Sequence, residues 1–231
     1  MRESPSDFTP FNADPPGQPP VRGFLHTPVD ASGEGLVLTH GAGGNSRTAL
    51  LVAVSRVFAA AGFQVLRCDL PFRQARTTGP PSPAGAARDR AGLQAALQAM
   101  RELGARRVAL GGLSYGGRQA SMLAADAPEI ARALLLFSYP LHPPGKPDAP
   151  RTAHLRELRT PAVFVFGTRD PFGSPAEIRQ AVTLVPAPTA LVEVEGAGHD
   201  LSRGRRAAAE THREVAARAL EALRGLAPER G

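Results

Sequence analysis

The sequence of 231 residues contains no tryptophan, two tyrosines and a single cysteine, Cys68. Because a disulfide needs two thiols, Cys68 excludes an internal disulfide and fits a reducing compartment. Cys68 lies in an apolar run, so we expect a buried structural thiol. No apolar stretch is long enough to span a bilayer, and the N-terminus lacks the apolar core of a signal peptide. These absences predict a cytoplasmic protein with no membrane partner.

Several ligand-binding signatures are also missing. The chain has no Gly-x-Gly-x-x-Gly fingerprint and no Gly-Lys-Ser/Thr loop, and its six histidines lack metal-ligand spacing. We therefore expect no cofactor and no metal. The net charge of +6 raises the question of nucleic acid, but the basic residues alternate with acidic ones on helical faces and no aromatic residues interleave them. We expect no nucleic-acid partner.

The order of apolar and amphipathic segments predicts an α/β fold. Residues 1–20 contain six prolines and few apolar residues, which is typical of a flexible arm. Residues 21–231 alternate short apolar runs with amphipathic segments, as in a single domain with a mostly parallel sheet covered by helices on both faces. We predict strands at residues 21–27, 36–39, 63–68, 108–110, 133–138, 162–166 and 191–194. We predict the main helices at residues 46–61 and 84–103, after Ser114, from Ser174 onward, and at 205–226.

The segment Gly112-Leu113-Ser114-Tyr115-Gly116 follows an apolar strand and precedes a stretch of small, helix-favouring residues. This is the strand–turn–helix context of a nucleophile elbow, in which a serine hydroxyl projects from a sharp turn. Chance can supply Gly-x-Ser-x-Gly in a glycine-rich chain, and a glycine-rich turn can also bind phosphate. Ser114 is therefore a candidate nucleophile whose assignment depends on the other loops.

Two other predicted strands run into loops that carry the partners of a serine nucleophile. Asp170 and His199 follow strands, and the order Ser, Asp, His along the chain is that of the hydrolase elbow fold. His199 could act as the base for Ser114, and Asp170 could orient the imidazole ring. Asp69 also ends a strand and stays an alternative acid, although it precedes Ser114.

The glycine-rich loop after the second predicted strand supplies a place for a developing negative charge. An oxyanion could accept hydrogen bonds from the backbone N–H of Tyr115 and from that of Ala42 or Gly43. The connection between residues 138 and 162 is too short for a substantial cap domain, so we expect an open site.

Six segments together resemble the α/β-hydrolase superfamily, and within it a small cap-less group near the dienelactone hydrolases and the bacterial relatives of testis-expressed protein thirty. The matching segments are residues 40–44, 69–73, 111–117, 139–147, 167–173 and 198–199. The resemblance implies an eight-stranded hydrolase fold and assigns a triad to Ser114, Asp170 and His199. The chain departs from that group in having Leu113 and Tyr115 beside the serine, and an N-terminal region too short for both usual leading strands.

Candidate pocket residues lie in the same loops. They are His40, Phe72, Arg73, Tyr139, His142 and Lys146. Lys146, with Arg73 and Arg76, could attract an anionic group, although solvated loop charges are the alternative. We expect His154 at the surface and His212 solvated on the terminal helix.

These residues predict a serine hydrolase that cleaves carboxylic esters or thioesters of a small-molecule acyl substrate through an acyl-enzyme. Two alternatives remain at this point. An acyltransferase would use the same triad and pass the acyl group to an alcohol or amine. A non-enzymatic interaction protein would keep the fold without the chemistry.

Overall fold

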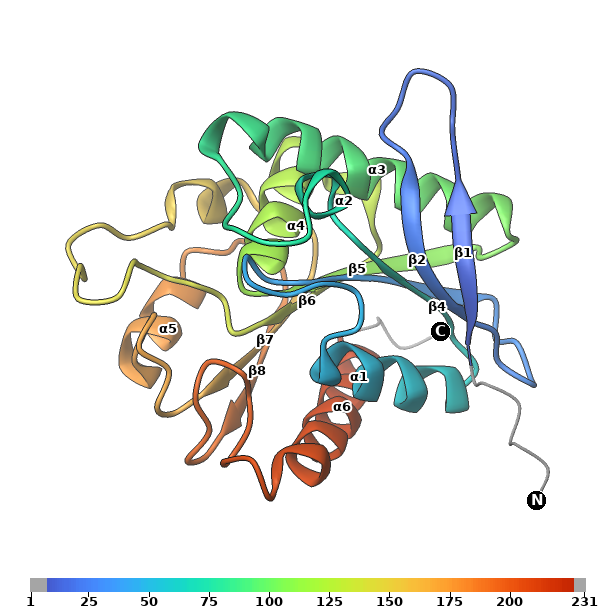
Figure 1. Ribbon diagram of the computed structural model, residues 1–231. Helices are drawn as coiled ribbons and strands as arrows, with labels where there is room; N and C mark the ends of the chain where they lie inside the picture. Colours follow the sequence, from blue (N-terminus) through green and yellow to red (C-terminus); the bar gives the residue numbers. More distant parts are fainter. Residues whose placement is uncertain (1–7, 227–231) are drawn as a thin grey trace.

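The computed structural model describes residues 8–226, and its centre is an eight-stranded sheet (Figure 1). The strands follow the order β1-β2-β4-β3-β5-β6-β7-β8. β2 runs antiparallel to both of its neighbours. All the remaining adjacent pairs, from β4 through β8, are parallel. The strands are β1 (Thr9–Ala13), β2 (Val21–His26), β3 (Glu34–Thr39), β4 (Gln64–Cys68), β5 (Arg107–Leu113), β6 (Leu134–Phe137), β7 (Ala162–Gly167) and β8 (Thr189–Val194).

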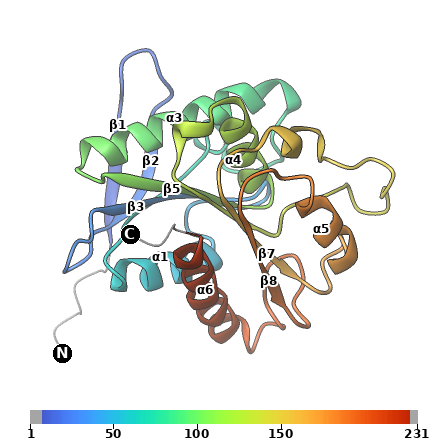
Figure 2. The ribbon, with the colours of Figure 1, turned by 180° about the vertical axis from the view of Figure 1, so that it is seen from behind.

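Helices cover both faces of the sheet. α1 and α6 pack against each other on one face, whereas α3 and α4 lie on the other (Figures 1 and 2). The α-helices are α1 (Ala49–Ala60), α2 (Pro71–Ala75), α3 (Ala86–Glu102), α4 (Tyr115–Asp126), α5 (Pro175–Val182) and α6 (Ala208–Gly225). Three short 3₁₀ segments are η1 (Pro83–Gly85), η2 (Pro128–Ile130) and η3 (Ala153–Glu157). None of the helices in the described range is both long and apolar enough to cross a membrane.

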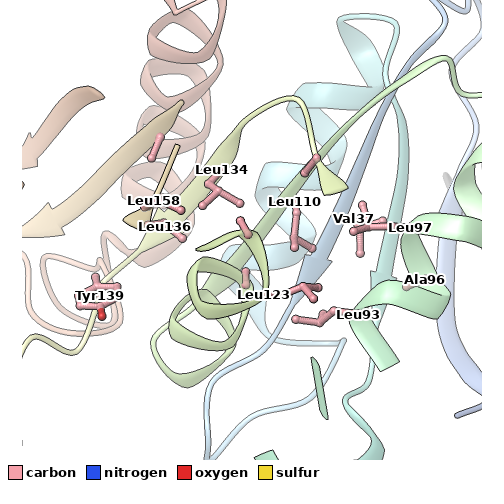
Figure 3. Packing of buried hydrophobic residues seen from close by; sticks show 14 of the residues in the cluster. Val37, Leu93, Ala96, Leu97, Leu110, Leu123, Leu134, Leu136, Tyr139 and Leu158 are labelled. Carbon is pink, nitrogen blue, oxygen red and sulfur yellow. The ribbon is translucent and has the colours of Figure 1, made fainter. Parts of the chain in front are cut away.

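The parallel strands bury side chains on both faces because successive residues of a strand point to opposite sides. In β3, Leu36 and Leu38 join the cluster beneath α1 and α6, whereas Val37 joins the cluster beneath α3 and α4. Figure 3 shows the second cluster, where Val37 and Leu110 of the sheet lie near the residues of α3. Burying each of these large side chains stabilises the fold by about 1.5–3 kcal/mol.

The N-terminal region corrects two sequence-based expectations. Thr9–Ala13 pairs with Val21–His26 as the edge strand β1, so the predicted flexible arm is wrong for these residues. Both leading strands are therefore present despite the short N-terminal region. Pro10 is tolerated because an edge strand has one side on which no ladder donor is needed. Residues 1–7 of the predicted arm lie outside the described range.

Two local predictions are confirmed. The Ser174 hydroxyl accepts a hydrogen bond from the Glu177 N–H, and the Glu177 carboxylate accepts one from the Ser174 N–H, which completes a capping box with Pro175 at the first turn of α5. Cys68 is a free thiol with 3% of its surface exposed. Burial raises the pKa of the Cys68 thiol to about 12, which makes it a poor nucleophile.

Candidate active site

Ser114 occupies a strained turn between β5 and α4, with φ of 51° and ψ of −115°. A non-glycine residue with positive φ is uncommon and marks a position that the surrounding structure enforces. The turn also depends on small neighbours. A Cβ on Gly112 would lie 2.6 Å from the carbonyl carbon of Gly116, and one on Gly116 would lie 2.5 Å from the His40 carbonyl oxygen. Glycine at both positions is therefore a steric requirement of the elbow.

A chain of hydrogen bonds joins three loops at the carboxyl ends of the strands. His199 Nε2 lies 2.9 Å from Ser114 Oγ, and His199 Nδ1 lies 2.8 Å from Asp170 Oδ2. Asp170 is nearly buried, with 3% of its side chain exposed, whereas the His199 side chain is 27% exposed. The structure thus brings together the three residues that the sequence predicted as a triad, and the histidine between the serine and the aspartate is partly exposed.

The partners of His199 fix the direction of each hydrogen bond. A carboxylate only accepts, so His199 Nδ1 donates to Asp170, and in the neutral ring Nε2 is then free to accept from the Ser114 hydroxyl. Asp170 Oδ1 also accepts from the backbone N–H of Phe172 over 2.9 Å. The Phe172 ring lies against the imidazole, with centroids 4.2 Å apart. Phe172, which the sequence analysis did not single out, therefore helps to hold both partners of Ser114.

The side chain of His40, the first residue of the glycine-rich loop of residues 40–44, stabilises this loop through two hydrogen bonds. His40 Nδ1 donates to the Gly41 carbonyl over 2.8 Å, so the neutral Nε2 accepts from the Leu70 N–H over 3.1 Å. Burial lowers the pKa of His40, which keeps the ring in this neutral form. His40 is fully buried and belongs to the support of the loop, which corrects its prediction as a pocket residue.

Arg73 of α2 holds the same loop from the side. Its Nη2 donates to the Ala42 carbonyl over 2.7 Å, and its Nε donates to the Gly44 carbonyl over 2.9 Å. The Arg73 residue is only 7% exposed. The guanidinium N–H groups of Arg73 therefore bind backbone carbonyls. The prediction that Arg73 lines the pocket and attracts an anion is wrong.

A buried carboxylate, Asp89 of α3, connects this support to the elbow. Its two oxygens accept from the Phe72 N–H over 3.0 Å and from the Tyr115 hydroxyl over 2.7 Å. Burial, followed by the hydrogen bond to Asp89, raises the pKa of Tyr115, so its hydroxyl stays protonated and donates. Phe72 packs edge-on against the Tyr115 ring, with centroids 5.7 Å apart. Asp89 was missed because a lone Asp on a helix carries no sequence signal.

Ser114 opens into a cavity of about 550 Å³ that Ala42 and Tyr115 also line. Prolines form much of the wall. Pro80, Pro81 and Pro83 come from the segment between α2 and α3, and Pro140 follows β6. The backbone N–H of Tyr115 opens α4, and a residue in the first helical turn has no carbonyl of its own helix to bind. The third predicted oxyanion donor, Gly43, is next to Ala42 but is not part of the wall.

The remaining predicted pocket residues lie outside this cavity. Phe72 is buried beneath it, and Tyr139 is buried with its hydroxyl donating to the Arg151 carbonyl over 2.6 Å. His142 borders a separate cavity of about 390 Å³, where its Nε2 lies 3.5 Å from a Glu177 oxygen. Lys146 is exposed. These predictions fail because the loops lie at the same edge of the sheet as Ser114, but these side chains do not line its cavity.

Two histidines differ from their expected environments, and the alternative acid Asp69 is not near His199. Half-buried His154 bonds Ser121 Oγ through Nε2 over 2.8 Å, and buried His212 bonds the Asp200 carbonyl over 2.9 Å, so neither is a surface histidine. Asp69 accepts from the Ser46 N–H over 2.6 Å, and its oxygen lies 3.7 Å from His40 Nε2. Asp69 therefore contacts a different histidine from His199.

The side chains that do line the cavity include Arg118 and Gln119 of α4 and Arg151 of the loop after β6. Sequence reasoning missed all three. Arg118 had a usable signal, since it follows Ser114 by four residues on a predicted helix and so lies on the same helical face. Arg151 had none, because its position depends on the path of a proline-rich loop.

Comparisons with known proteins identify the fold. A family model described as an alpha/beta hydrolase domain matches residues 32–227. An α/β serine hydrolase without a lid from Xanthomonas campestris is 16% identical with a TM-score of 0.74, and the match covers 100% of both chains. Dienelactone hydrolase from Anabaena variabilis is 22% identical with a TM-score of 0.72, covering 95% of this chain and 98% of that one. Est1E from Butyrivibrio proteoclasticus, in a structure with ferulic acid, is 16% identical with a TM-score of 0.69, covering 93% and 99%. At these identities the structural similarity shows a shared fold.

Proposed function

The chain belongs to the α/β-hydrolase domain family, and on that premise we propose that it is a serine hydrolase that cleaves carboxylic esters or thioesters. The observation that carries the proposal is the hydrogen-bonded chain from Ser114 through His199 to Asp170 at the mouth of a cavity. We place the protein among the small cap-less members of the family, on the resemblance of residues 139–147 to the bacterial relatives of testis-expressed protein thirty.

In the proposed mechanism, Ser114 Oγ attacks the carbonyl carbon while His199 Nε2 takes the hydroxyl proton. Asp170 stabilises the imidazolium that forms and keeps Nδ1 as the donor. The tetrahedral oxyanion accepts hydrogen bonds from the Tyr115 N–H and from the Ala42 or Gly43 N–H. His199 then protonates the oxygen or sulfur of the leaving group, which departs as an alcohol or thiol and leaves the acyl group on Ser114. Water, activated by His199, releases the acid.

A non-enzymatic interaction protein is the weaker interpretation. Such a protein would have no use for a serine that has a strained φ of 51° and is hydrogen-bonded to the histidine His199. Maintaining a positive φ at a non-glycine residue costs about 1–3 kcal/mol, and at Ser114 this cost coincides with the hydrogen bond to His199.

Labelling with a fluorophosphonate probe tests the proposal directly. We expect the wild-type protein to be labelled and to hydrolyse 4-nitrophenyl acetate. Ser114→Ala should abolish labelling and lower kcat by about 10⁶-fold, as is typical when a serine nucleophile is removed. Ser55→Ala is the matched control, because the Ser55 hydroxyl donates to the Leu51 carbonyl within α1. Equal labelling or equal hydrolysis in the Ser114→Ala variant would overturn the proposal.

A further inference from the structure

Three side chains bring N–H donors to the wall of the Ser114 cavity. Arg118 and Gln119 project from α4, and Arg151 enters from the loop between β6 and η3. Arg118 follows Ser114 by four residues, and its backbone N–H donates to the Ser114 carbonyl over 2.9 Å, so the two residues lie one helical turn apart and line the same cavity. The cavity that contains the proposed nucleophile therefore also carries several side-chain N–H donors in its wall.

Two of these donors have no partner within the described part of the chain. Gln119 is fully buried, and its Oε1 accepts from Arg90 Nη1 over 3.1 Å, while its Nε2 is buried without a hydrogen bond. Arg118 Nε is likewise buried without a hydrogen bond. Leaving a buried donor unpaired costs about 1–3 kcal/mol, and native proteins rarely accept that cost without a use for the group.

The charge of the cavity is equally unbalanced. Among the described residues that line it, two are arginines and none is an aspartate or glutamate. Burial lowers the pKa of Arg151, and the nearby positive charge of Arg118 lowers it further. Elsewhere an arginine such as Arg203 pairs with a carboxylate, here Glu214 at 2.7 Å. The two cavity arginines thus repel each other where an anion would relieve the repulsion.

We propose that Arg118, Arg151 and the Gln119 amide form a subsite for a carboxylate on the substrate. This inference rests on the proposed function of Ser114 and names its substrate class as esters or thioesters that carry a second, free carboxylate. A guanidinium binds a carboxylate through two parallel N–H donors, a geometry that suits a planar anion. Met122 and Pro140 line the same cavity and would contact an apolar spacer between the two ends of the substrate.

A pair of esters of equal length tests the subsite. Mono-4-nitrophenyl adipate and 4-nitrophenyl hexanoate share a leaving group and a six-carbon acyl chain, and differ in the terminal carboxylate. We expect the wild-type protein to favour the adipate ester at least tenfold in kcat/KM. Arg118→Leu and Arg151→Leu should each lower this ratio by about 10–100-fold, the usual effect of losing a hydrogen bond to a charged group. Arg118→Lys, which keeps the charge, should retain part of it.

Arg213→Leu is the matched control. Arg213 is an exposed arginine of α6, and its replacement removes the same charge far from the cavity, so the ratio should stay unchanged. If the hexanoate ester is cleaved but the ratio is near one and neither cavity variant changes it, the subsite is wrong and the hydrolase proposal stands.

Binding of adipate to the Ser114→Ala variant, measured by calorimetry, separates the two proposals when no ester is cleaved. Binding that Arg118→Leu weakens at least tenfold supports the subsite even if the hydrolase proposal fails. The absence of binding overturns the subsite.

Discussion

The Nη2 atom of Arg73 donates a hydrogen bond to the backbone carbonyl of Ala42 over 2.7 Å. Through this contact a side chain of α2 fixes the peptide unit between Ala42 and Gly43, which carries the Gly43 N–H, one of the proposed oxyanion donors. An arginine that is 7% exposed can hold such a loop firmly, because its hydrogen bonds compete little with water. Arg73 is therefore a positioning residue, and the geometry of the loop depends on a residue outside it.

Replacing Arg73 should impair turnover more than substrate binding. We expect Arg73→Leu to lower kcat for ester hydrolysis by about 10–100-fold with little change in KM, because displaced donors weaken stabilisation of the transition state. Arg73→Lys should recover part of kcat. Exposed Arg47 precedes α1 and provides the control variant Arg47→Leu. A variant with the wild-type kcat and a raised KM would contradict the positioning role.

The two aspartates near His199 should differ sharply in importance. Asp170→Asn is expected to lower kcat/KM by about 10³–10⁴-fold, because an amide cannot both orient Nδ1–H and stabilise the imidazolium. Asp200 accepts instead from the Ser202 N–H and hydroxyl, so Asp200→Asn should stay within about threefold of wild type. Steady-state kinetics with 4-nitrophenyl acetate compares them, and similar losses in both variants would remove Asp170 from the mechanism.

Gly112→Ala should destabilise the fold itself. Its Cβ would lie 2.6 Å from backbone atoms of Gly116 and Gly117, which cannot move aside as a flexible side chain can. We expect the free energy of unfolding in urea to fall by about 1–3 kcal/mol or more. In Gly225→Ala the new methyl group meets nothing within 4 Å, so this variant should be close to neutral. Equal stability of the two variants would show that the elbow can relax.

His154 should make the protein sensitive to mild acid. Burial, followed by the charge of Arg118, lowers the pKa of His154 from 6.5 to about 4. Between these pH values the unfolded chain binds a proton that the folded protein does not, so stability falls as the pH drops from 6.5 towards 4. For this partly exposed side chain we expect a loss of about 1 kcal/mol.

Urea unfolding at pH 7.5 and pH 5 measures this effect. His154→Gln can keep a hydrogen bond to Ser121 but has no proton to gain, so it should lose less stability than wild type over the same interval. An equal loss in both proteins would assign the acid sensitivity to other groups.

The sequence predicted the triad residues better than the side chains that line the cavity. Ser114, Asp170 and His199 follow apolar strands of a parallel sheet, so the topology alone brings them to one edge. The β1 strand was missed because Pro10 argues against a strand, whereas an edge position tolerates it. Arg73 and Lys146 were predicted as pocket cations because they lie in the right loops. The direction of a loop side chain depends on which carbonyls and solvent it meets, and these are set by contacts distant in sequence.

The prolines around the cavity have a consequence for recognition. A pyrrolidine ring fixes φ near −65° and has no side-chain rotamers to freeze, so Pro80, Pro81, Pro83 and Pro140 form a wall that is already preorganised before a substrate arrives. Ordering a flexible side chain at a binding surface costs about 0.5–1.5 kcal/mol in conformational entropy, and this wall avoids that loss. A substrate of the proposed hydrolase would therefore meet a cavity whose shape already exists in the free protein, and the entropic cost of binding would fall mainly on the substrate.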